Sequence, residues 1–244
     1  MTMPAGISIR ADRLVKHFGG AAALDGLSFE AVPGYINGFI GPDGAGKTTL
    51  FRIIAGLMTK YSGRLCFYDG GKEIPAETAR AVSAYMPGRP SLYPDLSIFE
   101  HLRFFKDLYG ISNDVFRNRA EELLEITRLS RFRDRKTGEL SGGMYKKTAL
   151  MCCLLQSPSV MLLDEPTNGV DPISRREFWE LLYRLADKNI LILISTAYMD
   201  EAERCGRVNL MGSGRLIAAG EPGALLAEYG ASGFDEVFIK RDTL

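Results

Sequence analysis

The chain has 244 residues, which suit one large α/β domain or one domain with an inserted lobe. Its 30 basic residues equal its 30 acidic residues, so the formal net charge at pH 7 is zero. Proteins that bind nucleic acid usually present a basic face, and this balance argues against such a partner.

The first third of the chain predicts strands and then a strand–loop–helix unit. Apolar residues alternate loosely from Ile7 to Leu14, and short apolar runs cover Leu27 to Ala31 and Ile36 to Ile40. A glycine-rich segment follows the third run. Thr48 to Met58 then carries apolar residues at helical spacing, which predicts a helix directly after the glycines.

The remainder of the chain predicts helices first and then alternating strands and helices. Between about residues 90 and 157 apolar residues recur every three or four positions, as in a helical lobe. Val160 to Leu163 and Ile190 to Ile194 are continuous apolar runs, typical of parallel strands buried on both faces. Arg175 to Leu185 lies between them and fits a crossover helix. From Glu221 onwards we expect a short helix and a tail.

Neither the cysteines nor the apolar runs indicate secretion or a membrane span. The four cysteines contain no Cys-x-x-Cys pair, which favours small buried side chains in a reducing compartment. The N-terminus lacks the cationic start and apolar run of a secretory signal. The apolar runs are far shorter than the ~18 residues that cross a bilayer. Any membrane segments are therefore expected on another chain or on another part of the gene product.

The segment from Gly41 to Thr48 matches the phosphate-binding loop (P-loop) pattern G-x-x-x-x-G-K-S/T. Glycines let backbone N–H groups turn inward around an anion, and the following helix N-terminus adds its dipole. Lys47 would reach the β- and γ-phosphates, and the Thr48 hydroxyl would coordinate Mg²⁺. The residues predicted to contact ATP–Mg²⁺ here are Gly41, Asp43, Gly44, Ala45, Gly46, Lys47, Thr48 and Thr49.

A second motif is the apolar strand from Val160, which ends in the carboxylates Asp164 and Glu165. In an open parallel sheet the carboxyl ends of the strands face the crevice that holds the ligand. Asp164 would then serve the metal, and Glu165 would polarise the attacking water. Such a strand end is equally common as a purely structural feature, but the P-loop upstream favours function. Glu165 and Lys47 are the predicted catalytic residues.

A third motif, Leu140-Ser-Gly-Gly-Met144, is followed by a predicted helix and forms another helix N-terminus able to grip phosphate. Here the chain resembles the nucleotide-binding domains of ABC transporters, whose signature motif is Leu-Ser-Gly-Gly at this place. The resemblance implies that Ser141, Gly142 and Gly143 close on the γ-phosphate held by a second ABC ATPase domain. The active species would then be a head-to-tail dimer with two composite sites.

The resemblance covers nearly the whole chain and implies its fold. The expected fold is an α/β P-loop NTPase with a RecA-like parallel sheet core, an N-terminal antiparallel β layer and an inserted helical lobe. A single ABC ATPase domain would cover residues 1–244. Its parts would be a core at about residues 1–89 and 158–220, a lobe at about 90–157 and a C-terminal tail at 221–244.

Other segments extend the resemblance. Phe18 stands where the family places an aromatic ring that stacks on adenine, although a core phenylalanine is the simpler interpretation of one aromatic residue. Asp171 is the characteristic acid of the loop that bridges the two monomers and would lie at the nucleotide. The segment from Leu92 to Leu102 is similar to the start of the helical lobe in ABC-2-type exporters.

Two positions depart from the family pattern. Gly88 follows Tyr85-Met-Pro87 where the family has a glutamine that touches Mg²⁺ or the attacking water and relays the nucleotide state to the membrane partner. Ala197 stands where the family has a histidine on the γ-phosphate. Engineered inactivation and a naturally degenerate domain both explain these losses. The surrounding motifs look like the N-terminal half of tandem ABC ATPases, in which one site is weaker, and this favours the natural domain.

The resemblance therefore implies an ATPase subunit, with ATP and Mg²⁺ as cofactors and a slow site on its own P-loop, that powers an ABC-2-type exporter. Its partners would be a second ABC ATPase domain and an ABC-2-type membrane permease. Its place would be cytoplasmic, peripheral to the inner face of the cell membrane. Two alternatives stay open: a soluble, non-transport ABC ATPase that acts as an interaction module, for example on ribosomes, and a regulatory ATP-binding domain without turnover.

Overall fold

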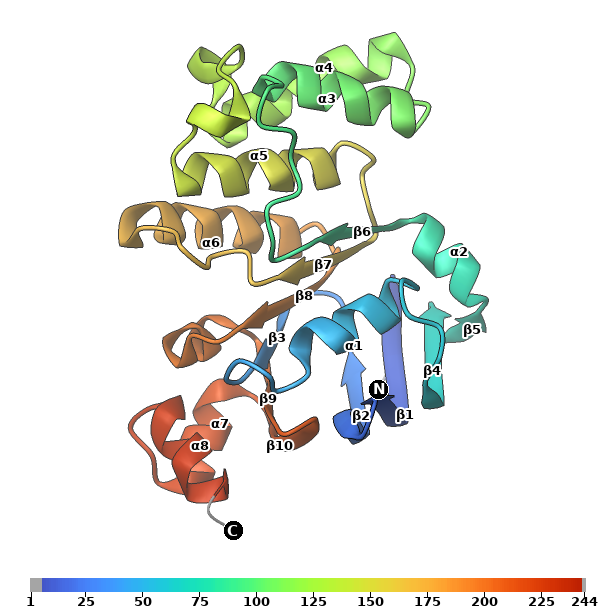
Figure 1. Ribbon diagram of the computed structural model, residues 1–244, viewed down its shortest axis with the longest axis vertical. Helices are drawn as coiled ribbons and strands as arrows, with labels where there is room; N and C mark the ends of the chain where they lie inside the picture. The colour runs from blue at the N-terminus through green and yellow to red at the C-terminus, as the bar shows by residue number, and fades with distance from the viewer. Residues whose placement is uncertain (1–5, 243–244) are drawn as a thin grey trace.

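Two β-sheets, with helices packed around and above them, form the computed structural model of the chain, which describes residues 6–242 (Figure 1). Residues 1–5, which belong to the predicted core, and residues 243–244, which belong to the predicted tail, lie outside the described residues. The start of the chain, where no secretory signal is expected, therefore lies outside them too.

The central sheet has six strands in the order β10-β9-β3-β8-β7-β6. The strands from β9 to β6 pair in parallel, and β10 pairs antiparallel with β9 at one edge. These strands are β3 (Ile36–Ile40), β6 (Ser83–Met86), β7 (Val160–Asp164), β8 (Leu191–Thr196), β9 (Arg207–Gly212) and β10 (Arg215–Gly220). Every residue of β3, β7 and β8 is buried, which explains why their sequences are continuous apolar runs rather than alternating ones.

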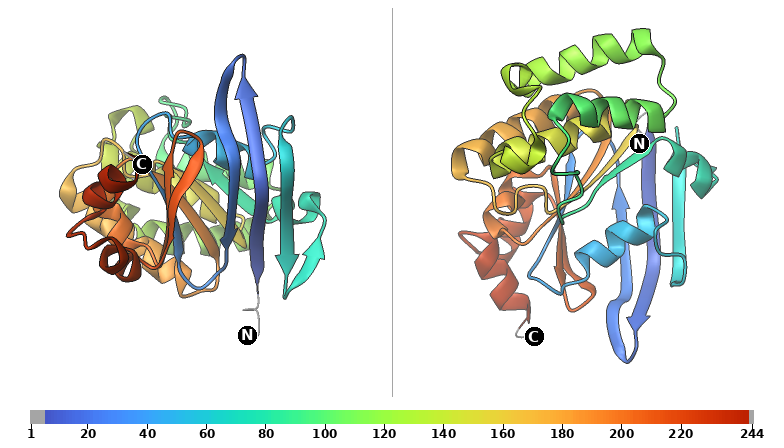
Figure 2. Two further views of the ribbon diagram at one scale, coloured as in Figure 1. Left: turned by 90° about the horizontal axis from the view of Figure 1, so that it is seen from below. Right: turned by 45° about the horizontal axis from the view of Figure 1, so that its top comes forward.

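The second sheet is antiparallel and has the strand order β2-β1-β4-β5. It consists of β1 (Ile7–Phe18), β2 (Ala21–Ala31), β4 (Ser62–Asp69) and β5 (Lys72–Ile74). Figure 2 shows its long strands standing beside the parallel sheet. The β1–β2 hairpin extends further than the sequence predicts. Its end, from His17 to Ala22, is exposed and therefore lacks the apolar alternation by which a strand is recognised.

The two sheets and the first helix share one hydrophobic core. Phe39 of β3 contacts Phe29 of β2 edge to face, with ring centroids 5.0 Å apart, and Phe51 of α1 (Lys47–Ile54) in the same way at 5.7 Å. Edge-to-face pairs of this kind add about 0.5–1.5 kcal/mol each beyond the burial of their area. The aromatic chain thus fixes α1, and the P-loop before it, against both sheets.

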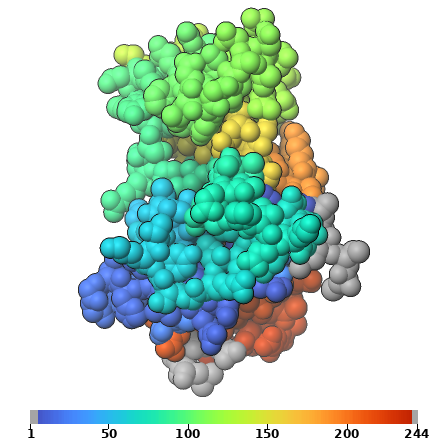
Figure 3. Space-filling model, turned by 90° about the vertical axis from the view of Figure 1, so that its right-hand side faces the viewer, coloured from blue at the N-terminus to red at the C-terminus, as the bar shows by residue number. Residues whose placement is uncertain are grey.

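Helices cover the sheets and build a separate lobe. The remaining helices are α2 (Ala76–Ala81), α3 (Ile98–Leu108), α4 (Asn113–Ile126), α5 (Gly142–Leu154), α6 (Pro172–Ala186), α7 (Pro222–Tyr229) and α8 (Phe234–Asp242), with 3-10 turns η1 (Ser130–Phe132), η2 (Thr137–Glu139) and η3 (Met199–Arg204). The lobe of α3 and α4 stands over α5, and Figure 3 shows it projecting above the body of the molecule. Ser97 and Glu100 form a capping box that begins α3.

The parallel sheet, the antiparallel layer and the helical lobe confirm the predicted α/β fold class. The first helix, however, is shorter than predicted. It ends at Ile54 rather than near Met58, because Gly56 takes a left-handed conformation with φ 79° and its N–H bonds back to the carbonyl of Ile53. Across residues 6–242, no helix combines the length and the apolar character needed to traverse a membrane.

Candidate functional site

The P-loop connects the carboxyl end of β3 to α1, and Lys47 at the start of α1 lies inside it. The Lys47 side chain is 3% exposed, and its Nζ donates to the carbonyl oxygens of Gly41 at 2.7 Å and Pro42 at 3.0 Å. Nζ also lies 3.5 Å from Oε1 of Glu165. The ammonium group therefore sits at the point where the loop, the helix and β7 meet.

Gly46 forces the shape of the loop. It is the N-cap of α1 and has φ 100°, a conformation that disfavours other residues. A Cβ at this position would also lie 2.3 Å from the carbonyl oxygen of Ala23. Because glycine has no side chain to cap the helix, the first N–H groups of α1 are left for a ligand, and an anion is the ligand that such a helix start favours.

The other P-loop residues are placed around this centre. Ala45 is buried, with its N–H bonded to the carbonyl of Pro42 at 3.2 Å, and Thr49 is half-buried on the first turn of α1. Asp43 and Gly44 are exposed at the open side of the loop, and Gly44 has φ 82°. The assignment of these residues to a nucleotide stays a prediction.

Asp164 ends β7 and accepts three hydroxyl hydrogen bonds. Its Oδ1 accepts from Thr48 Oγ1 at 3.1 Å and from Ser195 Oγ at 2.6 Å, and its Oδ2 accepts from Tyr85 OH at 3.1 Å. Burial, together with the Asp164 charge, raises the pKa of Tyr85 to about 12, so this phenol stays a donor. Carboxylate and hydroxyl oxygens are the donors that Mg²⁺ prefers, so Thr48 and Asp164 fit that ion.

Glu165 has an unusual backbone. Its φ of 47° is in the left-handed region, and its N–H bonds to both the carbonyl and the Oγ of Ser195 at 3.0 Å. Non-glycine residues in this conformation are held there by their surroundings and cluster at functional sites. Its carboxylate lies between Lys47 and Asn168, whose Nδ2 donates to Oε2 at 3.2 Å.

Gly88 and Ala197 flank this carboxylate pair. A Cβ on Gly88 would lie 3.1 Å from the carbonyl oxygen of Asp164 and 3.6 Å from Cβ of Glu165. Ala197 directly follows the end of β8, the strand that pairs Ser195 with Asp164. Gly88 therefore lies beside Asp164 and Glu165, Ala197 follows the strand that pairs with the end of β7, and neither position carries a polar side chain.

Ser141, Gly142 and Gly143 form a second cluster at the start of α5. Ser141 caps the helix and, like Gly142, is exposed. A Cβ on Gly143 would lie 2.4 Å from Cβ of Ser174, and one on Gly142 would lie 2.9 Å from the carbonyl oxygen of Gly169. The glycines thus allow the start of α5 to pack closely on the first turn of α6 and on the loop that precedes it.

Asp171 caps that next helix, accepting from the N–H groups of Ile173 at 3.1 Å and Ser174 at 3.0 Å. Its predicted contact with nucleotide is not needed to explain this geometry. Phe18 is 49% exposed at the end of β1, with Lys16 Nζ 5.0 Å from the ring centroid. The exposure removes the interpretation of Phe18 as a core residue.

Motif matching missed four residues of the candidate site: Tyr85, Asn168, Ser195 and Lys146. The Nζ of Lys146 lies 3.1 Å from the carbonyl oxygen of Glu165. Tyr85 and Ser195 lie near the carboxyl ends of β6 and β8, the two neighbours of β7 in the sheet. The order of the strands, which the sequence does not state, is what brings them to Asp164.

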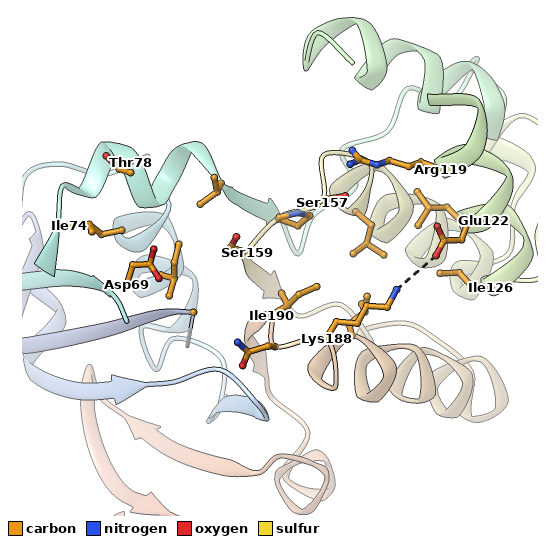
Figure 4. Close-up of a pocket in the computed structure, with 18 residues that line it drawn as sticks. Asp69, Ile74, Thr78, Arg119, Glu122, Ile126, Ser157, Ser159, Lys188 and Ile190 are labelled. Carbon is orange, nitrogen blue, oxygen red and sulfur yellow. Dashed lines mark ion pairs between the residues drawn. The ribbon is translucent and has the colours of Figure 1, made fainter. Parts of the chain in front are cut away.

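A cavity lies elsewhere in the molecule. It has a volume of about 640 Å³ and is lined by the residues just before β7 and β8, such as Ser159 and Ile190, so it lies at the opposite end of these strands from Asp164. Figure 4 shows Arg119, Glu122 and Lys188 around it, with Lys188 Nζ 3.9 Å from Glu122 Oε1. It shares no residue with either cluster described above.

The family model described as ABC transporter matches residues 24–168. YbhF of Escherichia coli (strain K12), described as a probable multidrug ABC transporter ATP-binding protein, is 48% identical over 193 residues, which cover 79% of this chain and 33% of YbhF. The match thus spans a third of the length of that relative. Nod factor export ATP-binding protein I of Paraburkholderia xenovorans (strain LB400) is 39% identical over 236 residues, which cover 95% of this chain and 76% of that protein.

Solved structures are similar over the whole fold. One described as an ATP-binding subunit of an ABC transporter has a TM-score of 0.81 and 29% identity, and the match covers 96% of this chain and 99% of that one. The ADP conformation of MJ1267, an ATP-binding cassette of an ABC transporter, has a TM-score of 0.78 and 27% identity, with 96% and 98% covered.

Proposed function

The chain belongs to the ABC transporter family, and from that membership we propose that it is the ATP-binding and ATP-hydrolysing subunit of an ABC-2-type exporter. The names of two relatives, a probable multidrug transporter subunit and a Nod factor export subunit, support export as the direction of transport. The proposal includes a second ABC ATPase domain as partner, on a separate chain or as the other half of a tandem protein.

The observation that carries the proposal is the convergence of four side chains from two distant segments. Thr48, at the start of α1, donates to Asp164 at the end of β7 over 3.1 Å. Its neighbour Lys47 lies 3.5 Å from Glu165, the residue after Asp164. Phosphoryl transfer needs little covalent chemistry from the protein and depends on positioning and charge neutralisation. A cation, a hydroxyl and two carboxylates around one helix N-terminus supply both.

Each residue has a role in this proposal. Lys47 and the N–H groups of the P-loop bind the β- and γ-phosphates, and Phe18 offers its exposed ring to the adenine. Mg²⁺, held by Thr48 and Asp164, would neutralise phosphate charge when bound. Glu165 orients and deprotonates the attacking water once Lys47 has turned to the phosphates.

We also propose that this site turns over slowly. Gly88 has no side chain and that of Ala197 is apolar, so neither position can donate a side-chain hydrogen bond toward the transition state, although Gly88 lies beside the carboxylate pair and Ala197 follows β8. Loss of one such donor typically slows an enzyme by about 10²–10³-fold. The start of α5 keeps Ser141, Gly142 and Gly143, and this cluster would complete the site of the partner domain.

The membrane partner would be an ABC-2-type permease, which puts the chain at the cytoplasmic face of the membrane. Three exposed apolar side chains of the lobe, Tyr93, Phe104 and Leu108, support such a contact, since clustered exposed apolar surface marks interaction sites. Tyr93 and Phe104 touch each other, with ring centroids 5.7 Å apart.

The proposal is tested by steady-state ATPase assays of the purified chain and by affinity purification from its native cells. Glu165→Gln should lower the turnover of the chain by about 10²- to 10⁴-fold, and an integral membrane protein should co-purify with the chain. Turnover that Glu165→Gln leaves unchanged contradicts hydrolysis at this site. Co-purification with ribosomes instead of a membrane protein supports the soluble alternative.

A further inference from the structure

Lys146 lies on the second turn of α5, and its ammonium group reaches into the carboxylate site of its own chain. Nζ donates to the carbonyl oxygen of Glu165 at 3.1 Å and to that of Gly88 at 3.3 Å. The residue is half-buried. Burial lowers the pKa of Lys146, while the charges of Glu165 and Asp164 act in the opposite direction. One side chain thus bridges three elements: α5, the segment after β6 and the end of β7.

The bridge includes the backbone of Gly88. The close approach of Gly88 to Asp164, where an added Cβ would be 3.1 Å from the carbonyl oxygen, brings the Gly88 backbone next to β7. There its own carbonyl accepts from Lys146. The departure at position 88 is therefore accompanied by a cation from α5 at the same place.

The bridge also completes the anchoring of Glu165. Ser195 holds the Glu165 N–H on one side through its carbonyl and its Oγ, and Lys146 holds the Glu165 carbonyl on the other. With φ at 47°, Glu165 needs such support from its surroundings to keep its conformation. The backbone conformation sets the direction in which the carboxylate leaves the strand.

We propose that Lys146 is a positioning residue for Glu165 and ties this carboxylate to α5, the helix whose N-terminus carries Ser141, Gly142 and Gly143. A displacement of α5 would pull on the Glu165 carbonyl and on the segment that leads from β6 into the lobe. The part of the inference that concerns turnover rests on the proposed function; the part that concerns the tie itself does not.

The kinetic test compares Lys146→Met, which keeps the length of the side chain and removes its donors, with Lys72→Met on the exposed strand β5 as the matched control. Loss of a charged donor should lower kcat about tenfold or more. The KM for ATP should stay within about twofold, because the P-loop supplies the binding contacts. Lys72→Met should leave both constants unchanged.

A double-variant cycle separates positioning from a general structural role. If Lys146 acts through Glu165, Lys146→Met should add no further loss to Glu165→Gln in single-turnover assays. If the double variant loses the product of the two single-variant rate factors, the proposal is overturned. If the methionine variant does not fold, Lys146→Gln, which keeps a neutral donor on a shorter stem, replaces it with the same expected directions.

The second readout needs no nucleotide. Hydrogen exchange in the nucleotide-free chain should become faster in Lys146→Met at the amides of residues 88, 89 and 91 and of residues 165, 167 and 168, and stay unchanged in Lys72→Met. Unchanged exchange at both segments overturns the tie whether or not the chain hydrolyses ATP. Faster exchange together with turnover that is insensitive to Glu165→Gln supports the tie and contradicts the proposed function.

Discussion

The Thr48 hydroxyl donates to Asp164 Oδ1 at 3.1 Å although 116 residues separate the two in sequence. This bond joins the first turn of α1 to the end of β7. The same two oxygens are those that would hold Mg²⁺. The fold thus brings the two predicted Mg²⁺ ligands together across the sequence.

Removal of the Thr48 hydroxyl is expected to weaken the metal-dependent part of ATP binding. Thr48→Val should reduce the affinity gained on adding Mg²⁺ by about tenfold, roughly 1.4 kcal/mol. Titration with a fluorescent ATP analogue, with Mg²⁺ and with EDTA, measures this gain. Thr59→Val, at an exposed position beyond α1, is the control and should not change it. An equal loss of affinity in both buffers would argue against a metal role for Thr48.

Restoring a donor at position 197 is expected to raise turnover. Ala197→His returns a side chain that can reach a γ-phosphate, and the steady-state ATPase rate should rise about 10- to 10²-fold. Gly88→Gln should help less, because its Cβ would be only 3.1 Å from the carbonyl oxygen of Asp164. A histidine variant with the rate of the unsubstituted chain would show that the lost donor does not limit this site.

Gly143 is expected to tolerate no side chain. Gly143→Ala places a Cβ 2.4 Å from that of Ser174, and overpacking of this kind costs about 1–3 kcal/mol. Chemical denaturation should detect the loss, and Ser174→Gly in the same chain should recover part of it. Gly223→Ala, with nothing within 4 Å of its new Cβ, should be neutral or slightly stabilising. Equal effects of both alanines would contradict the close packing of α5.

His101 is expected to make the lobe sensitive to acid. Its Nε2 accepts from the Tyr93 N–H at 2.9 Å, and its Nδ1 lies 3.0 Å from the Ser97 carbonyl oxygen, a pattern that requires the neutral ring. Burial lowers the pKa of His101 below its ordinary 6.5. The unfolded chain therefore binds the proton first, so the stability that His101 contributes is present above about pH 6.5 and is lost as pH falls below it.

Thermal unfolding between pH 8 and pH 5 measures this effect. His101→Gln should flatten the decline of the unfolding temperature below pH 6.5, whereas His17→Gln, at the exposed end of β1, serves as the control. A decline that is as steep in His101→Gln as in the unsubstituted chain assigns the acid sensitivity to other groups.

Much of the fold could be predicted because its strands and helices carry strong local patterns. The runs at Ile36 to Ile40 and Val160 to Leu163 are strands, as expected for residues buried on both faces. The P-loop and the start of α5 were found because glycine is required there by backbone conformation or close packing.

The site residues that motif matching missed are brought to the site by the order of the strands or by the length of a side chain. Tyr85 and Ser195 meet Asp164 only because β6 and β8 flank β7. Lys146 reads as one more charged residue on a helix, and its reach to the Glu165 and Gly88 carbonyls appears only once α5 is placed against both segments. The length of β1 was missed for a different reason: the hairpin end is exposed, and exposed residues leave no periodic apolar signal even where they pair with a neighbouring strand.

The ammonium group of Lys47 has two possible anionic partners, the Glu165 carboxylate and, under the proposed function, a phosphate of ATP. That group lies 3.5 Å from the Glu165 carboxylate. Under the proposed function, an incoming phosphate competes with the Glu165 carboxylate for Lys47. Separating Lys47 from Glu165 therefore lowers the observed affinity for ATP. When Lys47 turns to the phosphate, the Glu165 carboxylate is released, and the substrate whose water it would activate is then in place. Phosphate binding by Lys47 and release of the Glu165 carboxylate would thus be a single event.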